Sequence, residues 1–383
     1  MTSVIHLINK PQRRGAELFA LGLAKGLSES FDSRVVSIHS NGDEPVIEAQ
    51  QLLRLNAKIS QWNRFGLNWP AFLKLRRIVR EAESPVVVAH GSATLKYAAM
   101  LKIIGPRPKV IYRCIGVPSF WAGNRFKRMV NGLLFRTVDA VVCVSEASRA
   151  DFLKTYGLPD SVVSFIPNGV NIDEFYSRQT DSLGNLGRSA LNLPKDVPVL
   201  VTIGNISHEK NQAELIHVAS DLSCSGMDVY LVIIGDGPLR SELEQLARQL
   251  KIADHIRFAG LLDDVRPVLA AADVFVLSSK TEGMPGAVIE AGLSGVPTIA
   301  YDVGGISEVI DNGETGILVT PGDRKAFAKS VASVLDDRLL LNRTGQTAAV
   351  RFREKFDLAK IVDQYDTLLR SLFAEAPGVS DAA

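Results

Sequence analysis

Short runs of consecutive apolar residues recur along the whole chain, and stretches with helical periodicity separate them. Most of the runs are continuously apolar rather than alternating, which is typical of parallel strands covered on both faces. Regular alternation of strand and helix favours parallel β-α-β units. The runs are SVIHLI, RVVSIH, PVVVAH, KVIYRC, DAVVCVS and SVVSFIP in the first half, and VPVLVTIG, VYLVIIG, HIRFAG, DVFVLSS, VPTIAY and GILVT in the second.

This pattern predicts an α/β protein with two Rossmann-like domains, each a doubly wound parallel sheet of six such strands. The boundary is expected within 168–194, a polar, glycine-containing stretch with weak periodicity. We therefore expect an N-terminal domain at 1–173 and a C-terminal domain at 174–352. Residues 353–373 have the apolar spacing of a helix, and 374–383 are expected to be disordered.

Composition narrows the class of protein. With 46% hydrophobic and 22% charged residues among 383, the chain is neither disordered, collagen-like nor a coiled coil. Its apolar runs stop short of the roughly 20 residues of a membrane-spanning helix, and the run Val4–Ile8 is too short for a signal peptide. Cys114, Cys143 and Cys224 are too far apart for a disulfide framework or a CxxC metal pair. We therefore expect a cytoplasmic protein.

The formal net charge of +1 hides an asymmetry between the two halves. Residues 1–173 carry 23 basic and 13 acidic side chains, whereas 174–383 carry 20 and 29. The stretch 61–136 has 14 basic side chains and only Glu81 and Glu83 as acidic ones. Such a field attracts a nucleic acid, an anionic lipid surface or a phosphorylated substrate. A solvated basic exterior without a specific partner is the alternative.

Ligands of open parallel sheets bind beyond the carboxyl ends of the strands, so residues that follow the predicted strands are the candidates. Gly15 precedes a helix after the first strand, and Lys210 precedes a helix after the strand that ends at Gly204. Amides at a helix start with a lysine beside them suit a phosphate. Gly235 allows close approach of a ligand, although Arg240 breaks the GxGxxG pattern. A plain turn or a surface lysine is the alternative at each position.

The segment SSKTEGMPGAVIEAG carries most weight. Glu282 and Glu290 are eight residues apart, with a helix start between them. The helix start offers amides to a phosphate, and carboxylates accept hydrogen bonds from hydroxyl groups, which suits a sugar, a diphosphate and a ribose in series. A glycosidase pair is less plausible because it needs an acid of raised pKa opposite a water site. A carboxylate favoured by the helix dipole is the alternative for Glu290.

In combination and order, these motifs resemble the retaining, nucleotide-sugar-dependent glycosyltransferases of the B-type (GT-B) fold, family 4-like or group 1. The resemblance covers almost the whole chain. It rests on RGAE, CVSEASRADFLKTYG, IPNGVNIDEF, GNISHEKN, IGDGPLR, FAGLLDDV and EGMPGAVIE, the last with the family's glutamate–seven–glutamate signature. It implies a cleft between an acceptor-binding N-terminal domain and a nucleotide-sugar-binding C-terminal domain. It also implies that the C-terminal helix crosses back to the N-terminal domain.

The resemblance implies roles for single residues. Lys210 should neutralise the diphosphate leaving group, Glu282 should contact hydroxyls of the transferred sugar, and Glu290 should hold the ribose. Further positions implied around the donor and acceptor are Gly15, Gly204, Asn205, Gly235, Phe258, Gly260, Gly283, Met284, Pro285 and Gly286.

Two departures from the family pattern stand out. The family usually has an arginine where this chain has Asn205, so one cation at the diphosphate is missing, and Arg240 is a candidate replacement. Many relatives carry a functional histidine after the fourth strand of the first domain, where this chain reads IYRCIGVPS with Arg113. His90, after the preceding predicted strand, is then expected to contact the acceptor; a capping or partly buried histidine is the alternative.

The resemblance implies transfer of a hexosyl group, with retention, from a nucleoside-diphosphate sugar to a glycan or lipid-linked acceptor in cell-envelope polysaccharide or glycolipid synthesis. UDP- or GDP-sugars are the expected donors. Because Lys210 and the helix amides face the departing diphosphate, no cofactor and no metal ion are expected. Trp69 and Phe72 lie near basic residues in WPAFLKLRRIVREA, which suits peripheral contact with an anionic membrane surface, on the inner face of the cell membrane.

Other classes remain open at this stage. A non-hydrolysing nucleotide-sugar epimerase shares the two-domain fold and the donor, and an inactive sugar-nucleotide-binding homologue would show the same motifs. A glycan phosphorylase with pyridoxal phosphate would need a Schiff-base lysine and a much longer chain. Nucleic-acid binding is not expected, because no helix-turn-helix, zinc or RNP-type pattern is present in the sequence.

Overall fold

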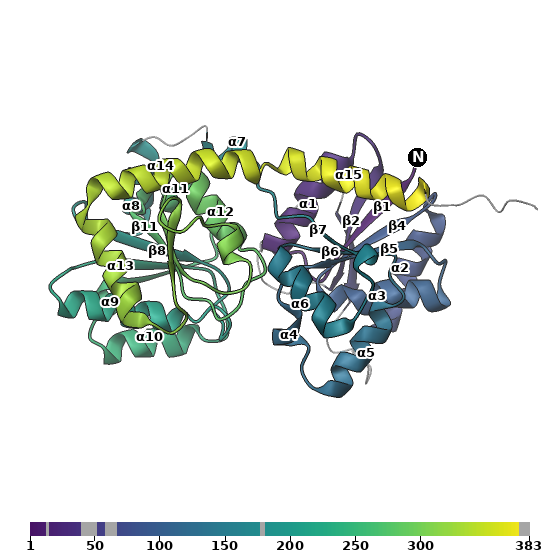
Figure 1. The fold of residues 1–383 in the computed structure, drawn as a ribbon, viewed down its shortest axis with the longest axis horizontal. Coiled ribbons are helices and arrows are strands. Elements are labelled where there is room, and N and C mark those ends of the chain that lie inside the picture. Colours follow the sequence, from purple (N-terminus) through teal and green to yellow (C-terminus); the bar gives the residue numbers. More distant parts are fainter. Residues whose placement is uncertain (13–14, 40–51, 58–66, 177–180, 375–383) are drawn as a thin grey trace, which may run out of the picture. The chain divides into compact units, whose positions relative to one another are not determined.

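The computed structural model describes residues 1–12, 15–39, 52–57, 67–176 and 181–374. Two compact units make up the chain: Met1–Gly169 with Leu358–Ala383, and Val170–Asp357. In each unit helices cover both faces of a parallel sheet (Figure 1). The predicted fold class, two doubly wound α/β domains, is confirmed.

The first unit has the strand order β3-β2-β1-β4-β5-β6-β7, so the order reverses between β1 and β4. Its strands are β1 (Ser3–Ile8), β2 (Asp32–His39), β3 (Leu52–Ala57), β4 (Val86–His90), β5 (Lys109–Cys114), β6 (Ala140–Cys143) and β7 (Val163–Phe165). Its helices are α1 (Gly15–Leu27), α2 (Trp69–Glu81), α3 (Ser92–Ile104), α4 (Pro118–Trp121), α5 (Arg125–Phe135), α6 (Glu146–Tyr156) and α15 (Leu358–Ala374).

The described part of this sheet has one strand more than the six predicted. The additional strand, β3, lies at the edge of the sheet and reads LLRLNA. Arg54 and Asn56 interrupt its apolar run, because an edge strand is not covered on both faces. The pattern of continuous apolar runs therefore missed it.

The second unit has the strand order β10-β9-β8-β11-β12-β13, with the reversal between β8 and β11. All six of its predicted strands are present: β8 (Val199–Ile203), β9 (Tyr230–Ile234), β10 (Ile256–Gly260), β11 (Val274–Leu277), β12 (Thr298–Tyr301) and β13 (Gly316–Val319). Its helices are α7 (Ile172–Tyr176), α8 (Asp181–Ala190), α9 (Gln212–Cys224), α10 (Arg240–Gln249), α11 (Arg266–Ala271), α12 (Gly286–Leu293), α13 (Arg324–Asp336) and α14 (Arg338–Lys355).

Helix α8 lies in the stretch interpreted as a linker with a short helix, and it packs on α11 of the same unit. The contact is so close that a Cβ on Gly187 would lie 2.0 Å from the carbonyl oxygen of Pro267. Glycine is therefore required for this helix pair. Residues 177–180 of the expected linker lie outside the described residues.

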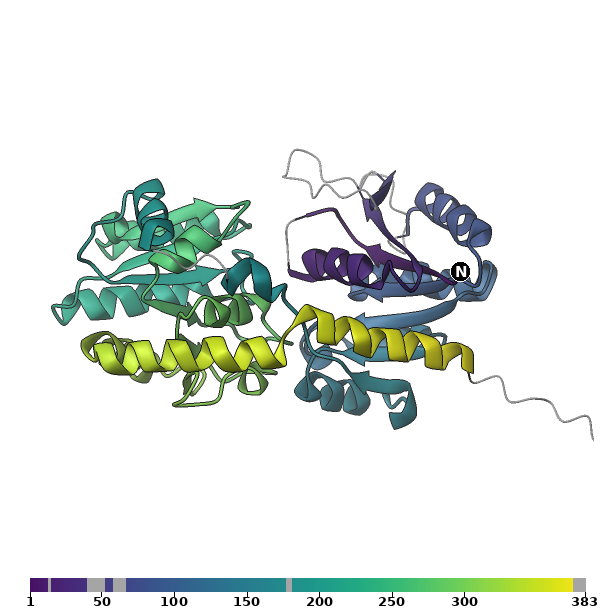
Figure 2. The ribbon, with the colours of Figure 1, turned by 90° about the horizontal axis from the view of Figure 1, so that it is seen from above.

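The C-terminal segment forms two helices where the periodicity predicts one helix over 353–373. The backbone N–H of Val170 donates to the carbonyl of Phe356 (2.9 Å), and Val170 pairs with Asp357 as an isolated bridge. This pairing diverts the chain between α14 and α15. Helix α15 then buries Ile361, Tyr365 and Leu369, spaced four residues apart, in the first unit, where it lies beside α1 (Figure 2). The expected disordered tail, 375–383, is outside the described residues.

The described helices include none that is both long and apolar enough to cross a membrane.

Candidate functional site

The strand order of the second sheet brings the two strongest candidate residues to one place. The order reverses between β8 and β11, and the reversal is where open parallel sheets bind their ligands. Lys210 lies in the loop after β8, and Glu282 lies in the loop after β11. Both side chains therefore lie beyond the carboxyl ends of β8 and β11, where ligands of open parallel sheets bind.

The two side chains form an ion pair. The Lys210 Nζ lies 2.5 Å from the Glu282 Oε1, and the Ser279 hydroxyl donates to the same oxygen at 2.6 Å. The Glu282 side chain is 9% exposed and that of Lys210 is 25% exposed. A buried carboxylate is costly unless it is paired, and here Lys210 and Ser279 supply the partners of the Glu282 carboxylate.

A second set of contacts fixes the backbone on which Lys210 stands. The buried Ser278 hydroxyl lies 2.8 Å from the Asn211 carbonyl and 3.3 Å from the Lys210 carbonyl. The backbone N–H of Lys280 donates to the Glu209 carbonyl at 2.8 Å. The loop after β8 is therefore tied to the end of β11. The sequence interpretation missed Ser278 and Ser279; the signal is two successive serines at the end of a buried strand, because buried hydroxyls need partners.

Helix α12 begins beside Glu282 with Pro285 at its N-cap and no side chain capping it. The amide of Val288 donates to the Pro285 carbonyl at 3.1 Å, whereas the amides of Gly286 and Ala287 have no hydrogen-bond partner within the described chain. Gly283, Met284 and Pro285 are buried. The helix start therefore presents donors and the positive end of a dipole to an anion.

Glu290 stands one turn further along α12 and is partly exposed. Burial, with a contribution from the like charge of Glu174, raises the pKa of Glu290 to about 7. Glu174 comes from α7, which packs on α12. No hydrogen bond or ion pair to the Glu290 carboxyl is found among the residues that the structure describes. The group is thus held in an apolar environment without a partner, which is costly unless a ligand supplies hydroxyl groups.

The glycines after β8 and β9 bring two loops together. The Gly204 amide donates to the Ile234 carbonyl at 2.9 Å. A Cβ on Gly235, which has a φ of 127°, would lie 2.0 Å from the Gly204 carbonyl oxygen. Gly235 therefore allows the backbone at Gly204 to come close; the approach of a ligand to Gly235 stays a prediction.

Asn205, which stands where the family usually has an arginine, and Arg240, the candidate replacement, make different contacts. The Asn205 carbonyl accepts a hydrogen bond from the Gln212 side chain at 2.9 Å. Arg240 pairs with Glu244 at 3.0 Å, and its guanidinium lies 5.8 Å from the ring centre of Phe258. A Cβ on Gly260 would lie 3.8 Å from Arg240. Arg240 is thus held at the end of β10, and its part at a diphosphate stays a prediction.

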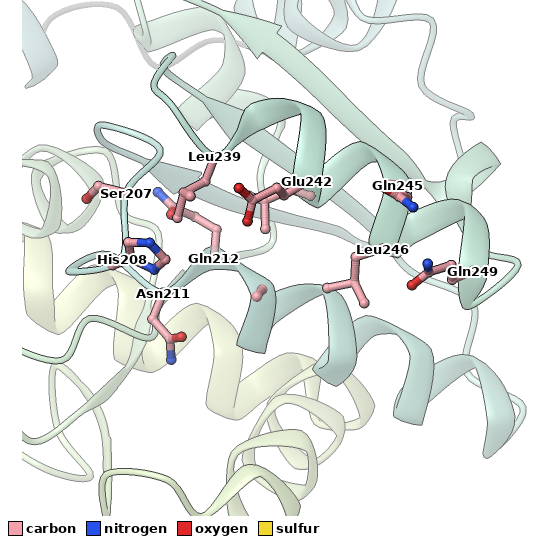
Figure 3. Close-up of a pocket in the computed structure, with 11 residues that line it drawn as sticks. Ser207, His208, Asn211, Gln212, Leu239, Glu242, Gln245, Leu246 and Gln249 are labelled. Carbon is pink, nitrogen blue, oxygen red and sulfur yellow. The ribbon is translucent and has the colours of Figure 1, made fainter.

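A groove of about 400 Å³ with a mixed polar and apolar lining lies between the loop after β8 and helices α9 and α10 (Figure 3). Its lining includes His208, Asn211 and Glu242, but not Lys210, Glu282 or Glu290. It therefore borders the Lys210 loop without containing the ion pair. The lining residues are Ser207, His208, Asn211, Gln212, Ala213, Leu239, Glu242, Leu243, Gln245, Leu246 and Gln249.

In the first unit, Gly15 begins α1, and the space where its Cβ would stand is open. Arg14 of the RGAE motif is outside the described residues. His90 ends β4 and is 5% exposed, with its Nε2 at 3.2 Å from Nδ1 of the buried His6. Burial and the charge of Arg113 lower the pKa of both histidines, that of His6 to about 3. Both rings are therefore neutral at pH 7.

Arg113 lies beneath helices rather than at an open edge. Its guanidinium is 3.8 Å from the ring centre of Phe19 on α1, and it donates to the Asn168 side chain. With β3 counted, His90 ends the fourth strand along the chain and Arg113 belongs to the fifth. The predicted departure at Arg113 rested on a strand count that omitted β3. A contact of His90 with an acceptor stays a prediction.

No cluster of three or more His, Cys, Asp or Glu side chains suited to a metal ion occurs in the parts of the chain that the structure describes.

Comparison with known proteins agrees with this geometry. Residues 187–351 match the family model for glycosyl transferases group 1, and residues 13–174 match the model for glycosyltransferase family 4. The lipopolysaccharide core biosynthesis glycosyltransferase LpsE of Rhizobium meliloti is 34% identical over 48% of this chain and 53% of its own length. The N-acetyl-alpha-D-glucosaminyl L-malate synthase of Bacillus anthracis is 28% identical over 70% of this chain and 69% of its own length.

A solved structure, HepE of Anabaena in complex with UDP and glucose, superposes with a TM-score of 0.84 at 21% identity and covers 97% of this chain and 100% of its own. That likeness shows the fold. The match spans 53% of the length of LpsE and 69% of the length of the malate synthase. The chain belongs to the group 1 glycosyltransferases, with the GT-B fold.

Proposed function

We propose that this glycosyltransferase transfers a hexosyl group, with retention, from a nucleoside-diphosphate sugar to a glycan or lipid-linked acceptor in cell-envelope synthesis. The donor is a UDP- or GDP-sugar. Two similar proteins support this choice: HepE, whose structure is in complex with UDP and glucose, and LpsE, a glycosyltransferase of lipopolysaccharide core biosynthesis. The second unit binds the donor and the first binds the acceptor.

The observation that carries the proposal is the Lys210–Glu282 pair beside the open start of α12. The amides of Gly286 and Ala287 receive the phosphate oxygens of the donor. Glu282 accepts hydrogen bonds from the sugar hydroxyls, and these bonds replace part of its interaction with Lys210. Lys210 is then available to the diphosphate, where negative charge develops as the sugar departs.

Glu290 completes the donor site. A ribose diol supplies two hydroxyl donors, and a carboxylate accepts both. The Glu290 carboxyl is partly buried and has no hydrogen-bond partner in the described chain, so its oxygens can accept from such a ligand. Phe258 and Gly260 at the end of β10 provide the surface for the base.

The transfer step needs no covalent nucleophile. The bond between the anomeric carbon and the diphosphate oxygen breaks, and the acceptor oxygen bonds to the same face of that carbon. The acceptor proton passes to the departing diphosphate. Lys210 and the α12 amides stabilise the charge on that leaving group, so transfer proceeds without a metal ion.

Thermal shift with UDP-, GDP-, ADP- and dTDP-sugars tests the donor site. At a hundredfold excess over Kd a ligand stabilises by about 2.7 kcal/mol, which moves the Tm by several degrees. One nucleotide class should shift the wild type but not Glu290→Ala. Asp228→Ala, which removes an exposed carboxylate just before β9, is the control that should keep the shift. Absence of any shift in the wild type overturns the proposal. Conversion of the donor without an acceptor would identify an epimerase instead.

For the acceptor, we propose a lipid-linked glycan reached at an anionic membrane surface through the first unit, by a protein otherwise in the cytoplasm. The basic stretch 61–136 supports it. Residues 61–66 of that stretch lie outside the described residues. Transfer to a small soluble molecule, such as the L-malate in the name of the Bacillus anthracis relative, is the outcome that would contradict it.

A further inference from the structure

Helix α5 turns its apolar stripe toward solvent. Phe126, Met129, Val130 and Leu133 follow the i, i+3, i+4, i+7 spacing of one helix face. They are 70%, 56%, 37% and 55% exposed. On an ordinary surface helix of a globular protein this face packs into the core.

The opposite side of α5 is the one that packs. Phe135 is buried, with its ring centre 4.6 Å from that of Tyr156 and 4.8 Å from that of Phe152, both on α6. Gly132 faces the same Tyr156 ring. The helix is therefore fixed on the unit mainly by the face that carries Phe135, and most of its apolar stripe stays exposed.

Basic side chains border the stripe. Arg125 is one turn from Met129, Arg136 is one turn from Leu133, and Lys127 is three residues before Val130, and all three are exposed. From 115 to 138 the sequence contains no acidic residue. An apolar stripe edged with cations and free of acidic neighbours matches the layering of an anionic bilayer surface, with acyl chains below charged headgroups.

Segments next to α5 in the chain or packed on it also expose apolar side chains. Phe120 of the short helix α4 is 49% exposed, and α3, which packs on α5, exposes Ile103 and Ile104 at its end. Exposed large apolar side chains on neighbouring elements are typical of an interaction site. Figure 1 shows α4 and α5 in the connection that leaves β5 at its carboxyl end, the edge where this kind of sheet receives ligands.

We propose that α5 is a membrane-docking element, which inserts Phe126, Met129 and Leu133 among the acyl chains of an anionic bilayer while its basic residues contact the headgroups. The docking surface is therefore α5, not the stretch WPAFLKLRRIVREA. In that stretch, α2, Phe72 is 1% exposed and Arg77 is paired with Glu81 at 2.8 Å, so its apolar face is already used in the core. This inference rests on the proposed lipid-linked acceptor.

Vesicle co-sedimentation of the full chain tests the assignment. The probes are vesicles of phosphatidylcholine alone and of phosphatidylcholine with an equal part of phosphatidylglycerol, at low and high salt. The wild type should bind only the mixed vesicles, and less at high salt. A triple variant Phe126→Ser, Met129→Ser, Leu133→Ser should lose at least tenfold in affinity. Its matched control, Trp69→Ser with Leu73→Ser on the exposed side of α2, should keep it.

Three single variants each remove one positive charge and leave the apolar stripe intact. Arg125→Gln, Lys127→Gln and Arg136→Gln should each lower affinity about fivefold. All these positions are exposed, so unchanged thermal unfolding verifies the fold of each variant. Equal vesicle binding by the wild type and the α5 variants overturns the inference. So does self-association that the triple variant abolishes without any vesicle binding, because a second copy would then cover the stripe. Donor-induced thermal shift, measured in parallel, separates failure of this inference from failure of the proposed function.

Discussion

The ammonium group of Lys210 lies 2.5 Å from the carboxylate of Glu282. The two residues come from loops after neighbouring strands, 72 positions apart. Because the pair is close to neutral as a whole, it does not act as a fixed positive site. A donor that brings hydroxyl groups to Glu282 and a diphosphate to Lys210 satisfies both partners at once, whereas a diphosphate alone leaves Lys210 shared with Glu282. This arrangement favours a sugar nucleotide over a free nucleotide.

Replacement of the lysine tests its role in the leaving step. Lys210→Gln removes the cation that faces the departing diphosphate, and loss of one such group costs about 3–4 kcal/mol, so kcat should fall 10²–10³-fold. Lys280→Gln replaces an exposed lysine two residues before Glu282 in the same loop; it is the control and should leave kcat unchanged. Equal kcat values for the wild type and Lys210→Gln would remove Lys210 from the leaving step.

Glu282→Gln separates sugar recognition from nucleotide recognition. The amide keeps the shape of the side chain but releases Lys210 from its ion pair. Calorimetric titration should show weaker binding of the sugar nucleotide and equal or tighter binding of the free nucleoside diphosphate. A parallel loss for both ligands would mean that the residue supports the loop rather than the sugar.

Ser278→Ala tests the tie between the two loops. The variant removes the hydroxyl beside the Asn211 and Lys210 carbonyls, which should cost about 1–2 kcal/mol of folding free energy. Because Lys210 is then less well placed, kcat should fall while KM for the donor changes little. Ser278→Thr, which keeps the hydroxyl, should restore part of the kcat. Loss of stability without any change in kcat would limit Ser278 to a structural role.

The raised pKa of Glu290 predicts a pH-dependent cost to stability. Its value is 4.5 for an unperturbed group and about 7 in the folded chain, so between these pH values only the unfolded chain releases the proton. The folded state is therefore penalised increasingly from pH 4.5 to 7 and fully above pH 7. The shift corresponds to about 3 kcal/mol, and partial exposure of Glu290 reduces what we expect to about half.

Urea unfolding of the wild type and Glu290→Gln measures this cost. The variant should be more stable by about 1–2 kcal/mol at pH 8 and nearly equal at pH 5. Its donor affinity should be lower, because an amide oxygen replaces one of two accepting oxygens. A gain of the same size at both pH values would show that ionisation of Glu290 is not the cause.

The sequence predicted the second unit better than the first. All six strands of its sheet stand in predominantly apolar runs, even the edge strand β10, where Arg257 interrupts the run and burial is partial. The loops after β8 and β11 follow from strand alternation alone. In the first unit the edge strand β3 lacks that signal, since Arg54 and Asn56 stand in it.

For the site, the sequence located Lys210, Glu282 and Glu290 on the correct elements, but spacing could not reveal the ion pair of the first two. That contact depends on β8 and β11 being neighbours, which is a property of strand order and not of local sequence. The raised pKa of Glu290 likewise depends on tertiary packing, because burial is its main cause and Glu174 on the packed helix α7 adds to it. The outward apolar stripe of α5 has the same periodicity as a core-facing stripe, so only the packing of Phe135 on α6 distinguishes them.

The most direct measurement is release of nucleoside diphosphate from UDP-, GDP-, ADP- and dTDP-sugars in the presence of bacterial lipid extract and oligosaccharide acceptors. The account predicts release from one donor class by the wild type and by Lys280→Gln, a fall of 10²–10³-fold for Lys210→Gln, and the donor's anomeric configuration in the product. Release at the same rate by wild type and Lys210→Gln, or no release from any donor, would contradict it.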